Sequence, residues 1–196
     1  FDKPTVGGTE NIMMAASLAS GTTNIFNAAT EPEVKNLGDF LRAMGADISG
    51  HGSNQIKIKG VSHLQGCTHK VSADRIEAGT FMVAAAATRG QITMNGADPR
   101  ELEVVSELLR ESGAEVETSV DKIRVSMDAR PRAVDIETAP FPGFPTDLQA
   151  QFMVLNSVAK GKAFVREQIF ENRFMHVQEL IRMGAKIELR GTNMAV

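Results

Sequence analysis

A short motif occurs three times in this sequence and constrains its fold more than any other feature. In each copy, Leu or Ile followed by Arg leads to a Gly-Ala pair, a charged residue and a branched apolar residue, at Leu41–Ile48, Leu109–Val116 and Ile181–Ile187. The motif glycines lie 68 and 71 residues apart. A second set of glycines, each after an apolar run, has spacings of 69 and 71 residues, at Gly21, Gly90 and Gly161. Two markers with nearly one period predict three copies of one structural unit.

The three copies predict one order of elements. An apolar helix comes first, at about 10–20, 76–88 and 147–159, and we expect it to end at a glycine of the second set in a left-handed cap. A strand follows, expected at Thr22–Asn27, Gln91–Asn95 and Lys162–Gln168. A second, amphipathic helix such as 99–112 ends at the motif glycine, and alternating strands such as Ile56–Ile58 and Lys122–Val125 come next. We therefore predict an α+β fold of repeated β-α-β-α-β-β units, with the apolar helix deeply buried and the second helix half exposed.

Composition narrows the class of protein. Apolar residues make up 42% and charged residues 23%, which is typical of a globular chain, and the net charge of −3 argues against a general nucleic-acid binder. Cys67 is the only cysteine, and neither a signal peptide nor a membrane-length apolar run is present. We expect a cytoplasmic protein without membrane or nucleic-acid partners. The chain opens at Phe1 without a Met and closes within a strand-like run, so we also expect it to be a piece of a longer chain.

Each predicted apolar helix follows a loop that could face a ligand, at Lys3–Asn11, Ser72–Glu77 and Pro140–Asp147. Helix N-termini present unpaired N–H groups and partial positive charge, so these loops could receive anions. The two glycines after Val6 would let a phosphate approach closely, although the pattern is more typical of a plain N-terminal cap. The proline-rich loop could deliver Asp147 as a general base, or Thr146 or Asp147 could simply cap the next helix.

Two arginines are further candidates for anion binding. Arg173 could hold a phosphate or carboxylate with two hydrogen bonds, or it could be an ordinary exposed helix residue. Arg75 could do the same, or it could pair with charges in its own helical turn. The four histidines and Cys67 have no metal-ligand spacing, so we predict no metal site.

Four motifs carry a family resemblance, at Thr5–Gly7, Asp74–Phe81, Phe144–Phe152 and Ile169–His176. With them the whole chain resembles the UDP-N-acetylglucosamine 1-carboxyvinyltransferases, a branch of the enolpyruvyl transferase family. The resemblance implies two lobes, each an inside-out α/β barrel of three β-α-β-α-β-β units. Residues 1–72 would be the last unit of one lobe, and residues 73–196 two units of the second lobe, whose third unit is missing. Cys67 lies outside the catalytic lid motif of the family.

The implied reaction transfers enolpyruvyl from phosphoenolpyruvate to the 3-hydroxyl of UDP-N-acetylglucosamine, an early step of peptidoglycan synthesis, without a cofactor. Asp147 matches the carboxylate that meets that hydroxyl. Lys3, Pro4, Thr5, Val6, Gly7 and the backbone of Ile169 would hold the UDP-sugar, and Arg173 and Arg75 would bind phosphate or carboxylate. The remainder of the parent chain would be the partner, and the piece alone would be inactive. A 3-phosphoshikimate 1-carboxyvinyltransferase and a non-catalytic repeat module are the alternatives.

Overall fold

The three motif glycines each end a helix in the same way in the computed structural model, which describes residues 1–196. Gly45, Gly113 and Gly184 all have a positive φ, near +100°. In each copy the N–H of the glycine bonds to the carbonyl three residues back, and the N–H of the next alanine bonds to the carbonyl five residues back, as in Ala114 to Leu109 at 2.9 Å. This is the Schellman motif, which satisfies helix-end carbonyls and favours glycine. The repeat predicted from sequence is therefore a repeat of structure.

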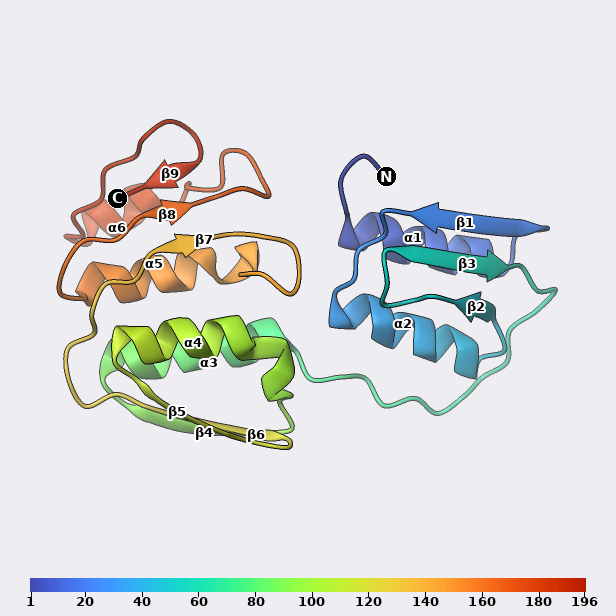
Figure 1. Ribbon diagram of the computed structural model, residues 1–196, viewed down its shortest axis with the longest axis horizontal. Coiled ribbons are helices and arrows are strands. Elements are labelled where there is room, and N and C mark those ends of the chain that lie inside the picture. Colours follow the sequence, from blue (N-terminus) through green and yellow to red (C-terminus); the bar gives the residue numbers. More distant parts are fainter. The chain divides into compact units, whose positions relative to one another are not determined.

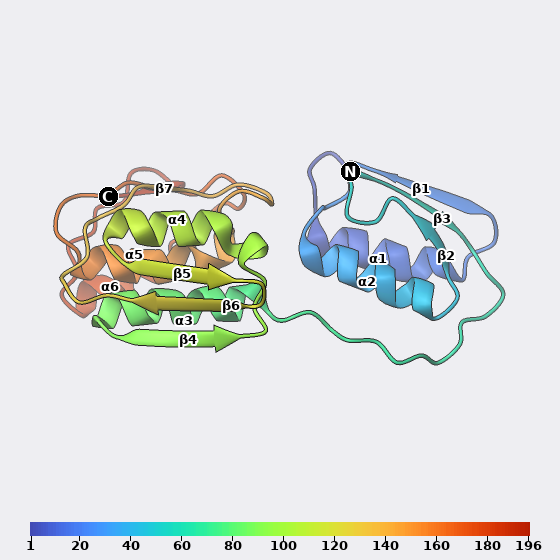
Figure 2. The same ribbon diagram turned by 60° about the horizontal axis from the view of Figure 1, so that its bottom comes forward.

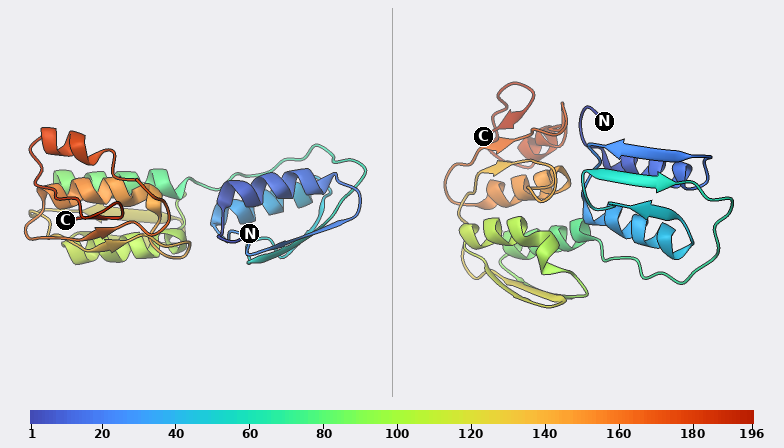
Figure 3. Two further views of the ribbon diagram at one scale, coloured as in Figure 1. Left: turned by 90° about the horizontal axis from the view of Figure 1, so that it is seen from above. Right: turned by 45° about the vertical axis from the view of Figure 1, so that its right-hand side comes forward.

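The chain folds into two compact units, Phe1–Ser72 and Ala73–Val196. The first unit contains, in order, α1 (Val6–Ser17), β1 (Thr22–Phe26), α2 (Pro32–Ala43), β2 (Asp47–Ser49) and β3 (Gln55–Lys59). Its three strands form an antiparallel sheet in the order β1-β3-β2. Both helices cover the same face of that sheet (Figure 3, left). The inward residues of the strands alternate, as in Ile56 and Ile58, and they pack against Met13 and Val34 of the helices.

The second unit contains two further copies of this arrangement. The first copy consists of α3 (Arg75–Thr88), β4 (Gln91–Asn95), the short 3-10 helix η1 (Pro99–Leu102), α4 (Glu103–Ser112), β5 (Glu115–Ser119) and β6 (Lys122–Ser126). The second consists of β7 (Ile136–Glu137), the 3-10 helix η2 (Thr146–Leu148), α5 (Gln149–Val158), β8 (Val165–Arg166), α6 (Val177–Arg182) and β9 (Met194–Ala195). Their sheets have the orders β4-β6-β5 and β7-β8-β9. Figures 1 and 2 show α3 and α4 together on one face of their sheet.

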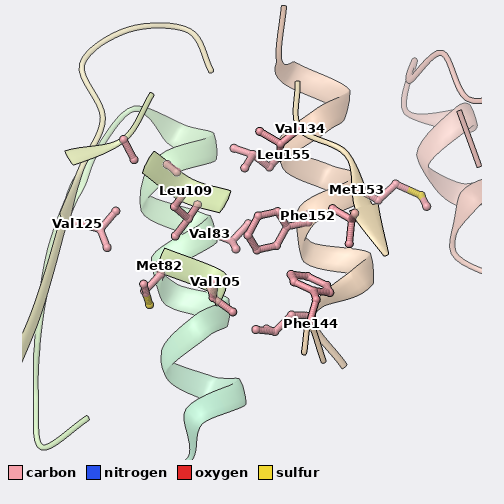
Figure 4. Packing of buried hydrophobic residues seen from close by; sticks show 14 of the residues in the cluster. Met82, Val83, Val105, Leu109, Val125, Val134, Phe144, Phe152, Met153 and Leu155 are labelled. Carbon is pink, nitrogen blue, oxygen red and sulfur yellow. The ribbon is translucent and has the colours of Figure 1, made fainter. Parts of the chain in front are cut away.

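One continuous core joins the two copies of the second unit, because α3 and α5 pack against each other. Figure 4 shows Phe152 of α5 directed toward Val83 of α3 and Leu109 of α4. Gly79 makes this close approach possible, since a side chain there would collide with Leu148. The Phe152 ring also meets Phe144 edge to face, with ring centroids 5.0 Å apart. The apolar helices α3 and α5 therefore bury one side of each other, whereas Phe81, Val154 and Val158 remain exposed.

The prediction of a deeply buried apolar helix is wrong for the first unit. There α1 buries only Thr9, Met13, Ala16 and Ser17, whereas Ile12, Met14 and Leu18 are exposed. The physical reason is that no second apolar helix of this unit covers α1 as α3 and α5 cover each other. The sequence shows that the residues of this helix are apolar, but it does not show how much of their surface other elements will bury.

Other details of the predicted repeat also need correction. Gly21 and Gly161 have positive φ, but they lie in the turns that enter β1 and β8, after α1 and α5 have ended. At the end of α3, Arg89 takes the left-handed conformation instead of Gly90. A strand precedes the apolar helix only in the third copy, as β7. The first strand of the predicted β-α-β-α-β-β order is thus present in the third copy and absent from the other two. The three sheets form no closed barrel.

The third copy differs from the others in its second helix. The distance from Gly161 to Gly184 is 23 residues, the same as from Gly90 to Gly113. However, α6 has only 6 residues, whereas η1 and α4 span 4 and 10 residues in the second copy. The residues that would begin the helix form instead a connecting segment, Glu167–His176, between β8 and α6. The third copy therefore has a longer connecting segment and a shorter second helix than the second copy, with the same number of residues between the two glycines.

Candidate functional site

A buried carboxylate organises the start of this segment. Glu167 directly follows β8, and it is only 2% exposed. Its oxygens accept hydrogen bonds from the hydroxyls of Thr138 (2.7 Å) and Thr146 (2.8 Å), the backbone N–H groups of Ile169 (2.9 Å) and Phe170 (3.2 Å), and the side-chain amide of Gln149 (3.5 Å). The carboxylate thereby ties the end of β7, the start of η2 and its own segment together.

These hydrogen bonds determine the charge state of Glu167. Burial raises the pKa of a carboxyl group, because the charged form loses water. In Glu167 the bonds from Thr138, Thr146 and the backbone of Ile169 and Phe170 outweigh that effect, and they hold its pKa below the usual 4.5. Glu167 is therefore ionised at neutral pH and acts only as an acceptor.

Asp147 and Arg173, two predicted site residues, form an ion pair beside Glu167. The Arg173 Nη2 atom donates to Asp147 Oδ1 at 2.9 Å, and Nη1 donates to the Thr146 hydroxyl at 3.4 Å. The guanidinium also lies over the Phe170 ring, 5.1 Å from its centroid. The side chain of Asp147 is 54% exposed and that of Arg173 39%. Both charges are thus fixed by the protein and accessible from outside it.

The proline-rich loop fixes where Asp147 stands. Phe144 is buried, its carbonyl accepts from the Ala139 N–H at 2.9 Å, and Gly143 fits because any side chain there would collide with Ala139. The alternative that Thr146 or Asp147 caps the following helix is wrong, since neither η2 nor α5 has a side-chain cap. Their polar groups are directed instead to Glu167 and Arg173.

Arg75 lies at the first position of α3 and is buried. Its guanidinium carbon is 5.7 Å from the centre of the Phe141 ring, in the same proline-rich loop that leads to Asp147. The preceding Asp74 caps α3, because its Oδ1 accepts from the N–H groups of Ile76 at 2.8 Å and Glu77 at 3.0 Å. Arg75 therefore supports the loop through an aromatic contact.

The predicted sugar-binding residues of the first unit lie at the start of α1. Lys3, Pro4, Thr5 and Gly7 are exposed, and Val6 is half-buried. Thr5 is the N-cap, and its hydroxyl accepts from the Gly8 N–H at 3.3 Å. The N-cap alternative is therefore realised at Thr5. The cap takes up the N–H of Gly8, one of the groups that a helix leaves unpaired at its start.

His176, at the end of the connecting segment, is the histidine nearest in sequence to Arg173. Burial lowers the pKa of His176, and the nearby charge of Arg173 lowers it further. The Nε2 atom of this histidine is buried without a hydrogen-bond partner.

No group of three or more His, Cys, Asp and Glu side chains in the chain could hold a metal ion. None of its helices has the length and hydropathy needed to cross a membrane.

A model of the family described as EPSP synthase (3-phosphoshikimate 1-carboxyvinyltransferase) matches residues 1–195. The chain belongs to the EPSP synthase family. Proteins named UDP-N-acetylglucosamine 1-carboxyvinyltransferase from Shewanella sp. (strain W3-18-1) and Shewanella amazonensis are each 57% identical to it over 192 residues. That alignment covers 97% of this chain and 46% of theirs, so the chain spans about half the length of these curated relatives.

Structure comparison agrees on the fold. The crystal structure of the enolpyruvyl transferase NikO from Streptomyces tendae is similar with a TM-score of 0.83 at 21% identity, over 96% of this chain and 45% of that one. The resemblance to the enolpyruvyl transferases is thus confirmed at the level of family and fold. The EPSP synthase family fold here consists of repeated helix pairs on three-stranded sheets.

Sequence reasoning did not identify Glu167 as a residue that organises this site, nor Thr138 and Gln149 as its hydrogen-bond partners. One signal was available. Six residues after the second set of glycines, the first two copies carry Asn27 and Gly96, both with positive φ, whereas the third carries Glu167. A departure from the repeat at that point marks the place where the third copy changes its backbone.

Proposed function

We propose that this chain is about half of an enzyme that transfers enolpyruvyl from phosphoenolpyruvate to the 3-hydroxyl of UDP-N-acetylglucosamine and releases phosphate. One observation carries the proposal: 57% identity over 192 residues to proteins named for that reaction. The exposed pair of Asp147 and Arg173 is compatible with it, because both substrates are polyanions and the acceptor must lose a proton. In this proposal the reaction belongs to peptidoglycan synthesis and takes place in the cytoplasm.

The proposed mechanism gives Asp147 the role of general base. A sugar hydroxyl is a poor nucleophile at neutral pH, so its proton passes to the Asp147 carboxylate as its oxygen bonds to C2 of phosphoenolpyruvate. C3 gains a proton from a donor, which gives a tetrahedral adduct. The bond from C2 to the phosphate oxygen then breaks, and loss of a proton from C3 restores the double bond in the product. The atoms of both substrates are thereby accounted for.

The remaining site residues bind and orient in this proposal. Lys3, Pro4, Thr5, Val6 and Gly7 hold the UDP-sugar, since the start of α1 offers backbone N–H groups and positive potential. The backbone of Ile169 contacts the sugar, because an isoleucine side chain has no polar group. Arg173 binds a phosphate or carboxylate group with the donors that Asp147 and Thr146 leave free, and Arg75 contributes positive charge beneath the loop.

We also propose how the chain is placed in the whole enzyme. Residues 1–72 are the last repeat of one lobe, and residues 73–196 are two repeats of a second lobe built as an inside-out barrel. The two compact units and the three copies of the helix-sheet arrangement support this division. In the proposal the chain alone is inactive, because the other repeats supply further binding groups.

The substitution Asp147→Asn in the full-length transferase tests the proposed base. Losing the base should lower kcat by about 10²–10⁴-fold while substrate binding changes little. Asp128→Asn is the matched control, because Asp128 is an exposed carboxylate of the same unit, and it should leave kcat unchanged. An unchanged kcat in Asp147→Asn would contradict the role of Asp147. Absence of transferase activity in the unsubstituted protein would instead favour a non-catalytic repeat module.

A 3-phosphoshikimate 1-carboxyvinyltransferase is the second candidate, since the matching family model carries that description. Titration calorimetry of the full-length protein with each acceptor separates the two. We expect heat of binding with UDP-N-acetylglucosamine and none with shikimate 3-phosphate. The reverse result would overturn the proposed acceptor.

A further inference from the structure

The two oxygens of the Glu167 carboxylate have separate partners. Oε1 accepts from the Thr138 hydroxyl and from the N–H groups of Ile169 and Phe170, and therefore holds backbone. Oε2 accepts from the Thr146 hydroxyl at 2.8 Å and lies 3.5 Å from the Gln149 amide nitrogen. Both partners of Oε2 are donors, so this position requires an atom that can only accept.

A continuous chain of hydrogen bonds leads from Oε2 to Asp147. The Thr146 hydroxyl has one hydrogen, which it gives to Glu167, and its oxygen is then directed to Arg173 as an acceptor for Nη1. The other end of the same guanidinium, Nη2, donates to Asp147. The buried carboxylate of Glu167 thus sets the direction of the Thr146 hydroxyl, and that hydroxyl accepts from one edge of the Arg173 guanidinium. All four groups come from η2 or the segment after β8.

We infer that Glu167 is a positioning residue of the transfer reaction: through the Thr146 hydroxyl its buried carboxylate holds Arg173, and with it Asp147, in the geometry for proton removal. This inference rests on the proposed function. Glu167 touches no substrate in this scheme. It acts on the reaction because a base must lie within hydrogen-bond reach of the proton it removes, and small displacements are costly.

The chemistry of a Glu167→Gln substitution distinguishes positioning from support of the backbone. The amide oxygen of glutamine can replace Oε1 and keep the bonds from Thr138, Ile169 and Phe170. Its NH₂ group at the place of Oε2 would meet two donors, so the Thr146 hydroxyl must turn its hydrogen away, and the link from the carboxylate through this hydroxyl to Arg173 is broken. Thr146→Val removes the same link from the other side, because valine has the shape of threonine without the hydroxyl.

The test measures kcat, both KM values and thermal unfolding for the full-length transferase and its variants Glu167→Gln, Thr146→Val and the double variant. We expect each single variant to lower kcat by about 10- to 100-fold. The kcat of the double variant should lie within about threefold of that of the more impaired single variant, because both substitutions break the same chain of hydrogen bonds. The matched control is Thr138→Val, which removes a hydroxyl from the other oxygen of the same carboxylate. It should lower the unfolding temperature but change kcat by less than about threefold.

The outcomes separate the inference from the proposed function. If the unsubstituted enzyme transfers enolpyruvyl but Glu167→Gln and Thr146→Val keep kcat within about threefold, the positioning role is overturned and the proposed function stands. A loss of kcat in Thr138→Val as large as in Thr146→Val would also overturn it, since the effect would then be general loosening. If the unsubstituted enzyme has no transferase activity with these substrates, the proposed function itself is wrong.

Discussion

At the scale of single residues, the pKa of Glu167 gives the site a dependence on pH. Its hydrogen bonds hold the pKa below 4.5, so the folded chain binds this proton less readily than the unfolded chain. The stability contributed by Glu167 is therefore present above about pH 4.5, and it is lost as the pH falls through the lowered pKa. The ionised form is the one that the five neutral donors stabilise.

We expect Glu167→Gln to unfold more easily than the unsubstituted chain by about 1–3 kcal/mol at pH 6, because a buried acceptor is replaced by a donor. The difference should shrink as the pH falls below about 4.5, because the unfolded chain then takes up a proton at Glu167 more readily than the folded chain. The lowered pKa of His176 reduces stability below about pH 6.5 in both proteins, so it cancels in the comparison.

Denaturant unfolding followed by circular dichroism measures this difference, since the chain has no Trp or Tyr for fluorescence. Glu107→Gln, at an exposed position of α4, is the control and should show no such trend. A difference that stays constant between pH 6 and pH 3 would show that Glu167 is not ionised in the fold.

The residues of the site differ in how far sequence could predict them. Asp147, Arg173 and Ile169 lie in motifs that resemble a family, and the structure brings Asp147 and Arg173 into contact across 26 residues of chain. Glu167 lies in no such motif. Its importance depends on Thr138 and Thr146, which are 29 and 21 residues away, and local patterns do not report such contacts.

At the scale of elements, the glycine that ends each second helix is a conformational requirement. Gly45 has φ of +102°, and a side chain at this position would meet no atom within 4 Å. Gly45→Ala should therefore destabilise the first unit by about 1–2 kcal/mol through backbone strain alone. Gly66→Ala is the matched control, because Gly66 also has open space around it but no positive φ.

Thermal unfolding of the two variants checks this expectation. Gly66→Ala should be neutral or slightly stabilising, since alanine reduces the freedom of the unfolded chain. Equal unfolding temperatures for the two variants would mean that the left-handed turn tolerates a side chain, and that the repeated glycines reflect something other than backbone conformation.

Sequence patterns predicted these elements well where the signal is local. Strand Gln91–Asn95 has the predicted bounds, and the end of the second helix at each motif glycine is confirmed. Patterns failed where burial depends on distant neighbours, as for the exposed face of α1.

At the scale of the whole molecule, residues 60–74 separate two units that have separate hydrophobic cores. This stretch contains no helix or strand, and Lys70 is exposed within it. Brief trypsin digestion of the chain should therefore cut first after Lys70, because proteases need an accessible, extended backbone. Mass spectrometry of the two fragments checks the position.

The substitution Lys70→Gln is the control for this cleavage. It should slow the first cut markedly, since the remaining basic residues on either side, Lys59 in β3 and Arg75 in α3, lie in regular structure. A first cut within β1–β3 or within α3–α5 would contradict the division into two stable units.

The shortened helix of the third copy has a consequence for how such a fold acquires chemistry. Three equivalent copies offer three equivalent positions for a polar segment after the first strand, and in two of them a helix of ordinary length occupies the available residues. Besides its additional strand β7, the third copy differs in this shorter second helix, which arises without any insertion between Gly161 and Gly184. Under the proposed function, the segment in which the third copy differs from the other two also carries Arg173, so a departure from the repeat is a place to look for candidate groups before any substrate is known.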